Sequence, residues 1–300
     1  MDTEPRRHRS IISIDDLTDA DVAGILRRAR QLLTSPPERN GTPFAAGLLF
    51  LSSSLRTRVG FAAATIRLGG TPVDVAETRS GTEMSSAESL EDTVRTLGGM
   101  VDLLVTRTGG LLPAIASRLA CPVINGGEGG GEHPTQALID LLAIKEECGD
   151  LGALRIGLCG DLGARSVRSL VKLFERWPPK QLTLMAPAER SADARQMSDL
   201  LGTRITISEE ADFASLDVLY MIGLPPGTGA DRLTSSTRAE FALDARSIGT
   251  LPAGAVVLCP LPVIDEIAPE VRDDRRVRMF AQSDRGVAVR MACIEFCLDH

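Results

Sequence analysis

The stretch Glu132-His133-Pro134-Thr135-Gln136-Ala137-Leu138 joins a glycine-rich loop to a helix, and the pattern of the fold extends from it in both directions. Glycines crowd in before it, and apolar residues with helical spacing follow it at Leu138, Leu141 and Leu142. His133 is the only histidine in the body of the chain, because the other two lie near its ends. A loop that delivers one imidazole and one carboxamide to a helix start suits a small polar substrate, while a capping role is the structural alternative.

Strands and helices alternate on both sides of this stretch. Before it, strands are expected at 48–51, 71–75, 101–105 and 122–125, with helices at 56–68, 89–97 and 111–119. After a helix at 134–148 the pattern restarts, with strands at 155–159, 181–185, 205–207, 218–221 and 256–258, helices at 165–175 and 192–201, and a closing helix at 287–298. Such alternation is typical of parallel sheets covered by helices. The sequence therefore predicts an α/β protein with two parallel-sheet halves.

The composition argues against several classes of protein. The 300 residues carry a net charge of −7 and a pI near 5.2, which disfavours nucleic-acid binding. The first ten residues lack the apolar stretch of a signal peptide, and no run of about 18 apolar residues offers a membrane span. The six cysteines form no C-x-x-C pair, so we expect reduced thiols in a cytoplasmic protein, without a structural metal or disulfide.

Two turns that contain arginine follow expected strands in the first half. Ser52-Ser53-Ser54-Leu55-Arg56-Thr57-Arg58 precedes a helix, where backbone N–H groups, hydroxyls and the forked guanidinium of Arg56 suit a phosphate. Serine-rich turns before helices are more often caps, so that alternative stays open. Arg107 ends another strand, at the sheet edge where open α/β sheets bind ligands, although a solvated loop arginine is the commoner case.

Two turns of the second half also contain groups that could bind a ligand. Gly157, Gly160 and Gly163 are spaced G-x-x-G-x-x-G instead of G-x-G-x-x-G, so no nicotinamide cofactor is expected, and Arg165 could instead take a carboxylate. The turn Cys259-Pro260-Leu261-Pro262 leaves carbonyl groups outside any helix, and these can accept hydrogen bonds from an NH2 group. A merely rigid loop is the simpler interpretation of this second turn.

Taken together, these segments resemble the aspartate and ornithine transcarbamylases, with the aspartate branch closer. The resemblance rests on five segments in the family's order: Ile11 to Leu17, Ser54-Leu55-Arg56-Thr57-Arg58, His133-Pro134-Thr135-Gln136, Gly160-Asp161-Leu162 with Arg165, and Pro260-Leu261-Pro262 with Asp265-Glu266-Ile267. It implies a carbamoyl-phosphate-binding domain at 1–137 and 286–300, and an amino-acceptor domain at 138–285. The C-terminal helix would return to the first domain.

The resemblance also implies a mechanism with carbamoyl phosphate as donor and no cofactor or metal. Phosphate would lie against Ser54, Leu55, Arg56 and Thr57, and the carbonyl oxygen would be polarised by Arg107 and His133 with help from Thr57. Gln136 and the backbone carbonyls near Leu261 and Pro262 would hold the carbamoyl NH2 group. Arg56, Thr57, Arg107 and His133 are thus the expected catalytic residues. Family members that resemble the chain are trimeric, with sites at subunit borders, so a homotrimer is expected.

The chain departs from the family pattern at several positions. Leu55 replaces a threonine of the phosphate loop, and Ser86 stands where the aspartate branch lends a lysine from a neighbouring subunit. Gly223 and Val263 stand where arginines are expected, whereas Arg165 is kept as a ligand for one carboxylate. Whether Arg79 or Arg232 replaces the missing cations is left open by the sequence.

These departures lead to three hypotheses for function. The first is a carbamoyltransferase that uses an amine other than aspartate, because the donor side is largely kept while the acceptor side is changed. The second is a homologue without activity that serves as a binding or scaffolding subunit. The third is a true aspartate carbamoyltransferase that uses substitute residues.

Overall fold

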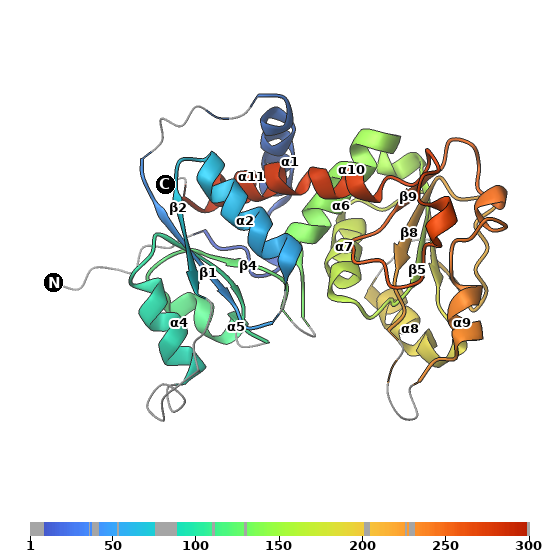
Figure 1. Cartoon of the computed structure of the whole chain (residues 1–300), viewed down its shortest axis with the longest axis horizontal. Coiled ribbons are helices and arrows are strands. Elements are labelled where there is room, and N and C mark those ends of the chain that lie inside the picture. Colours follow the sequence, from blue (N-terminus) through green and yellow to red (C-terminus); the bar gives the residue numbers. More distant parts are fainter. Residues whose placement is uncertain are drawn as a thin grey trace. The chain divides into compact units, whose positions relative to one another are not determined.

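The computed structural model describes residues 9–35, 37, 42–52, 54–75, 89–109, 112–128, 131–200, 205–225, 227 and 232–298. The chain forms two compact units (Figure 1). Unit 1 comprises Met1–Leu138 and Arg285–His300, and unit 2 comprises Ile139–Asp284. None of the helices within these described ranges is both long and apolar enough to cross a membrane.

The sheet of unit 1 has four parallel strands in the order β2-β1-β3-β4. They are β1 (Ala45–Phe50), β2 (Thr71–Val75), β3 (Leu103–Arg107) and β4 (Val123–Asn125). Every residue of β3 and β4 is buried, as expected for parallel strands covered on both faces. The sequence placed β1 at 48–51, but small residues from Ala45 onward also pair, because Gly47 gives room for Leu104 and Val101.

The order of these strands fixes where a ligand can lie. From β1 the chain passes to β2 on one side and later to β3 on the other, so β1 and β3 flank a topological switch point. Phe50 and Arg107 are register partners at the carboxyl ends of these two strands, and Thr106 pairs with Asn125 of β4. The turns after β1, β3 and β4 therefore open onto the same edge of the sheet.

Helices of unit 1 are α1 (Asp19–Thr34), α2 (Leu55–Arg67), α4 (Leu90–Gly98), α5 (Leu112–Ile115) and α11 (Gly286–Leu298). The helix expected at 111–119 is shorter than predicted, since Ala116–Arg118 tighten into a 3-10 turn of the kind common at helix ends. The C-terminal α11 belongs to unit 1 and runs beside α1 and α2 (Figure 1).

Unit 2 repeats the architecture with five parallel strands in the order β7-β6-β5-β8-β9. The strands are β5 (Arg155–Gly160), β6 (Gln181–Met185), β7 (Ile205–Ser208), β8 (Val218–Ile222) and β9 (Val256–Leu258). The helices are α6 (Pro134–Cys148), which crosses the unit boundary in sequence, α7 (Arg165–Arg176), α8 (Ser191–Leu200), α9 (Ser235–Glu240) and α10 (Met279–Asp284). The predicted fold class, two parallel-sheet α/β domains with a returning C-terminal helix, is confirmed.

Candidate active site

Arg107 lies at the carboxyl end of β3 and is held by the loop that follows β4. Its side chain is buried, and its Nη2 and Nε donate hydrogen bonds to the carbonyl oxygen of Gly126 at 2.8 and 3.1 Å. Its guanidinium also lies 5.9 Å from the centre of the Phe50 ring, at the end of β1. The Arg107 side chain is therefore a fixed cation at the switch point and not the solvated loop arginine that the sequence left open.

Gly127 brings Arg107 and His133 together. A β-carbon at this glycine would lie 2.8 Å from Nη2 of Arg107, 2.8 Å from Cδ2 of His133 and 3.0 Å from its Nε2. The backbone at Gly127 has φ +104°, a conformation that side chains with a β-carbon rarely adopt. The imidazole, which is also buried, and the guanidinium thus meet at one point of bare backbone, and two donors for a single ligand oxygen can converge there.

Asn125 shapes the loop that carries Gly127. Its Oδ1 accepts hydrogen bonds from the N–H groups of Gly127 and Glu128 at 2.7 and 3.0 Å. Its Nδ2 donates to the carbonyl oxygen of Ile12 at 2.8 Å. This buried amide ties the loop to the N-terminal segment and satisfies backbone groups that would otherwise be buried without partners.

Two carboxylates complete the support of the loop. Glu128 accepts hydrogen bonds from the backbone N–H and the hydroxyl of Thr108, at 2.9 and 2.6 Å. Glu132, next to His133, accepts from the hydroxyl of Ser13 at 2.5 Å and from the N–H of Ile14 at 3.1 Å. Sequence reasoning missed Asn125, Glu128 and the role of Glu132. The only signal it offered was that polar residues flank a glycine-rich turn.

The expected phosphate loop forms the start of α2. Ser54 occupies the N-cap position but makes no side-chain capping hydrogen bond, so no hydroxyl from this position caps the first turn. Thr57 is buried, Arg56 is exposed, and the side chain of Leu55 is 74% exposed. Leu55 therefore places no apolar obstacle over the turn, and its backbone N–H does not depend on the type of side chain.

The remaining expected residue of unit 1 lies in the first turn of α6. Gln136 is half-buried, and its N–H donates to the carbonyl oxygen of His133 at 3.0 Å. Its position three residues after His133 puts the two side chains on neighbouring parts of the same helix start. Ser86 and Arg79 lie outside the described residues.

The expected residues of unit 2 lie at the carboxyl edge of its own sheet. Arg165 is the first residue of α7 and half-buried, after the turn that leaves β5. Leu261 adopts φ 59°, in the left-handed region, and precedes a cis peptide bond to the exposed Pro262. A leucine in this region is unusual, and such residues cluster at functional sites. Arg232 is exposed.

A buried network supports the turn that contains Leu261. Asp140 of α6 accepts hydrogen bonds from the hydroxyl of Tyr220 and from Nε2 of Gln282, both at 2.6 Å. The Oε1 of Gln282 accepts in turn from the N–H of Cys259 at 2.8 Å. Asp140, Tyr220 and Gln282 are at most 1% exposed. Burial raises the pKa of the Tyr220 phenol well above its usual value, and the neighbouring Asp140 carboxylate adds to this shift.

Glu266 holds the other side of the same turn. Its Oε2 accepts hydrogen bonds from the N–H groups of Ile264 and Asp265 at 2.7 and 3.1 Å. A β-carbon at Gly223 would lie 2.8 Å from this oxygen and 2.9 Å from Ile264. Asp265 also pairs with Arg238 at 2.5 Å, which places a guanidinium beside the turn at a position that the sequence did not indicate.

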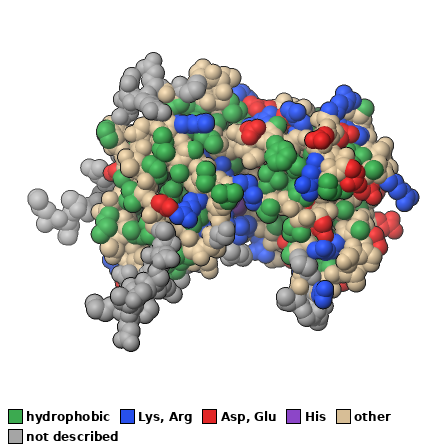
Figure 2. All heavy atoms as spheres, in the orientation of Figure 1, with side chains coloured by type: hydrophobic (Ala, Val, Ile, Leu, Met, Phe, Trp, Pro, Cys, Tyr) green, Lys and Arg blue, Asp and Glu red, His purple; other side chains and the backbone are tan. Residues whose placement is uncertain are grey.

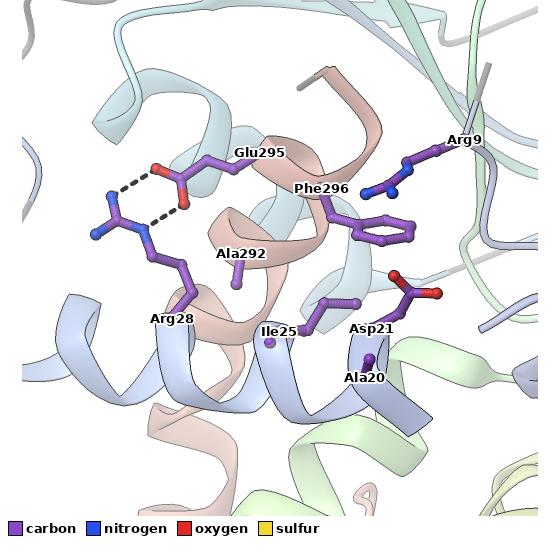
Figure 3. A pocket seen from close by; sticks show the side chains of 9 residues that line it. Arg9, Ala20, Asp21, Ile25, Arg28, Ala292, Glu295 and Phe296 are labelled. Atoms are coloured by element: carbon purple, nitrogen blue, oxygen red, sulfur yellow. Dashed lines mark hydrogen bonds and ion pairs between the residues drawn. The ribbon is translucent and has the colours of Figure 1, made fainter. Parts of the chain in front are cut away.

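A separate hollow of about 540 Å³ lies in unit 1 between α1 and α11 (Figure 3). Arg28 spans one side of it with a forked ion pair to Glu295, at 2.6 and 2.7 Å. On the other side, the Arg9 guanidinium lies 4.9 Å from the centre of the Phe296 ring. The hollow contains none of the expected site residues, and its ion pair fastens α11 to α1.

Comparisons with known proteins show the family to which the chain belongs. A model of the aspartate/ornithine carbamoyltransferase carbamoyl-P binding domain matches residues 9–146. The aspartate carbamoyltransferase catalytic subunit of Finegoldia magna is 36% identical over 302 residues, which cover 96% of this chain and 97% of that protein. The chain belongs to the aspartate/ornithine carbamoyltransferase family.

Further matches support the aspartate branch of the aspartate/ornithine carbamoyltransferases. The chloroplastic aspartate carbamoyltransferase of Oryza sativa is 36% identical over 267 residues, which cover 83% of this chain and 71% of that protein. The crystal structure of aspartate transcarbamoylase from Trypanosoma cruzi with carbamoyl phosphate and aspartate superposes with a TM-score of 0.86. It is 30% identical, covering 97% of this chain and 96% of that one. Membership of the aspartate branch of this family is therefore confirmed.

These relatives overturn one expectation for this carbamoyltransferase. The sequence led us to expect an acceptor other than aspartate, whereas the matched proteins are aspartate carbamoyltransferases along nearly their whole length. The error has a physical cause. The charge of a pocket depends on every side chain that reaches it. The residue types at positions 223 and 263 alone therefore do not determine that charge. Arg238, which forms an ion pair with Asp265 beside the turn at Leu261, is a charged side chain that the comparison of single positions did not include.

Proposed function

We propose that the protein transfers the carbamoyl group of carbamoyl phosphate to the amino group of aspartate. The observation that carries the proposal is the meeting of Arg107 and His133 at Gly127, beside the start of α2. Membership of the aspartate branch supplies the acceptor. The scaffolding alternative is less well supported, because a protein without activity would not need two buried hydrogen-bond donors, Arg107 and His133, to meet at a glycine.

In this proposal the donor belongs to unit 1. The first turn of α2, with Ser54, Leu55, Arg56 and Thr57, holds the phosphate through N–H groups, hydroxyls and a guanidinium. Arg107 and His133 hold the carbamoyl oxygen, and Gln136 the carbamoyl NH2. A helix start attracts anions, which fits a phosphate group at this place.

The acceptor and the turn at Leu261 and Pro262 belong to unit 2 in this proposal. Arg165 is assigned to one carboxylate of aspartate, and the carbonyl oxygens of Leu261 and Pro262 accept hydrogen bonds from the carbamoyl NH2. Support comes from the position of Arg165 at the carboxyl edge of the sheet and from the network that fixes the turn.

The reaction then follows from positioning and electrostatics. The amine lone pair attacks the carbamoyl carbon, and the carbonyl electrons move to the oxygen held by Arg107 and His133. The intermediate collapses as the carbonyl re-forms and the C–O bond to phosphate breaks. The phosphate then leaves at the start of α2 and takes the proton that the attacking amine gives up. Donors fixed before the reaction stabilise the developing charge without reorganising, which is the largest single contribution in many enzymes.

We also propose that the protein acts as a cytoplasmic homotrimer. The face that carries α2 exposes hydrophobic side chains (Figure 2), and these include Leu55 at 74% and Val59 at 57% exposure. A hollow of about 580 Å³ beside them is lined by Leu51, Ser54 and Leu55. Exposed apolar residues next to a proposed substrate loop favour coverage by another copy of the chain.

Formation of carbamoyl aspartate tests the proposed function. The purified protein is mixed with carbamoyl phosphate and aspartate, and the product is measured over time. Wild type should form carbamoyl aspartate, and Arg107→Met should lower kcat about 100- to 1,000-fold, as loss of an oxyanion donor does. The same mixture without protein measures the spontaneous reaction. No product above that background from a folded protein would contradict the proposal.

A further inference from the structure

Arg290 is a buried cation that has no anionic partner among the residues that the structure describes. It lies in α11, and its side chain is 5% exposed. Within the described part of the chain it forms no hydrogen bond or ion pair, and its Nε is buried without a partner. Its guanidinium stacks over Phe61 of α2, 5.6 Å from the ring centre. Burying a charge is costly, so this arrangement calls for a compensating group.

Arg290 reaches the face of α2 that begins at the proposed phosphate loop. A β-carbon at Gly60 would lie 2.7 Å from Nη1 of Arg290 and 2.9 Å from its Cζ, so the guanidinium fills the space that this glycine leaves open. Gly60 comes one helical turn after Arg56, on the same side of the helix. Two guanidinium groups therefore share one side of the first two turns of α2.

Their proximity affects the ionisation of Arg290. Burial lowers the pKa of Arg290 to about 10, and the positive charge of Arg56 lowers it too, partly opposed by Cys293. Arg290 therefore still carries its charge at neutral pH. A phosphate dianion bound at this helix start would attract both cations and would offset the repulsion between them, so the two charges favour binding of the anion.

We propose that Arg290 is a positioning residue for phosphate: it keeps a buried positive charge behind the first turn of α2, and an anion at residues 54–57 compensates that charge. The inference rests on the proposed function, which puts the phosphate of the donor at this turn. Arg290 acts on the bound anion through the electrostatic field of its positive charge, together with that of Arg56. It does not need to contact the substrate. Packing of a long side chain against Phe61, without any role in binding, is the competing explanation.

Binding of inorganic phosphate separates the two explanations. Calorimetry with phosphate should give a dissociation constant roughly tenfold higher for Arg290→Met, which keeps the stem but loses the charge, than for wild type. Arg290→Lys, which keeps the charge, should stay within about threefold of wild type. Arg290→Met should also unfold at the same or a higher temperature without phosphate, because an uncompensated buried charge is gone.

Two further variants complete the experiment. Gly60→Ala should displace the guanidinium of Arg290 and weaken phosphate binding. The double variant Gly60→Ala/Arg290→Met should bind phosphate no more weakly than Arg290→Met alone. Arg9→Met is the matched control, since it removes another arginine stacked on a phenylalanine of unit 1 (Figure 3) and should leave phosphate binding unchanged.

The outcomes distinguish this inference from the proposed function. If wild type binds phosphate and Arg290→Met binds it equally well, the inference is wrong and the proposed function stands. Equal loss in Arg290→Lys and Arg290→Met would also overturn the inference, because the charge would then not matter. If wild type itself binds no phosphate, the donor site of the proposed function fails.

Discussion

At the scale of single residues, Gly127 decides whether the site can form. Its α-carbon lies where Arg107 and His133 meet, so even a methyl group there would push both side chains apart. The motif around His133 was visible in the sequence, and so was Arg107 at a strand end. That both converge on one glycine was not, because the glycine-rich run offers several equivalent candidates and only the backbone conformation selects Gly127.

Gly127→Ala should lower kcat/KM about 100-fold, the loss expected when reacting groups move by about an ångström. Gly149→Ala is the matched control. Gly149 has a similar backbone conformation, φ +86°, but nothing lies within 4 Å of its β-carbon position. The control should lose about 1–2 kcal/mol of stability and keep its kcat/KM. Steady-state kinetics of carbamoyl aspartate formation checks both variants, and equal effects in the two would refute the explanation based on crowding.

Asp274 provides a pH-dependent test. Hydrogen bonds from the side chain and the backbone of Arg276 lower its pKa to about 2, from 3.8. The carboxylate therefore stabilises the fold at pH values above about 4, and this contribution is lost as the pH falls through about 2. Asp274→Asn should be less stable than wild type at pH 7, with a difference that shrinks between pH 4 and about 2.

Urea unfolding at a series of pH values measures this difference. Asp273→Asn, a change at the exposed neighbouring carboxylate, is the control and should follow the wild-type curve. A difference between Asp274→Asn and wild type that is constant down to pH about 2 would contradict the role of Asp274.

At the scale of elements, buried polar side chains fix the turns that carry the site. Strands, helices and most of their order follow from apolar periodicity and turn residues, which are local properties. The anchors do not. Glu132 binds Ser13, 119 residues away, and Asn125 binds Ile12, 113 residues away, so no local pattern could reveal either pair. The turn expected to bind phosphate could be singled out because its serines, its arginine and the helix start are neighbours in sequence.

Tyr220→Phe tests the network beneath the turn at Leu261. It leaves the buried Asp140 carboxylate with one donor fewer, so the free energy of unfolding should fall by about 1–3 kcal/mol. Thr206→Val, which removes an exposed hydroxyl from β7, is the control and should change the stability by less than about 0.5 kcal/mol. Urea denaturation measures both, and an unchanged stability of Tyr220→Phe would contradict a stabilising role of the hydrogen bond between Tyr220 and Asp140.

At the scale of the whole molecule, the parallel-sheet architecture was predictable, whereas the acceptor was not. Alternation of strands and helices extends over the entire chain, so errors at single residues do not change the outcome. The acceptor depends on a few charges contributed by several turns, and the type of residue at one aligned position does not show how those charges combine. The similarity of whole chains therefore corrected what comparison of single positions had suggested.

The proposed trimer has its own test at this scale. Val59→Asp puts a charge on an exposed apolar position of α2 and should shift the protein from trimer to monomer in light scattering, with loss of activity in parallel. Phe280→Asp is the control, because Phe280 is similarly exposed, at 62%, but lies in α10 of unit 2. A wild-type protein that is monomeric and fully active would contradict the trimer.

A crystal structure of the protein with carbamoyl phosphate would test the central claim most directly. We predict phosphate oxygens at the backbone N–H groups of residues 54–57 and the carbamoyl oxygen within hydrogen-bond distance of both Arg107 and His133. Carbamoyl phosphate bound elsewhere, or with its carbonyl oxygen turned away from these two side chains, would contradict the account.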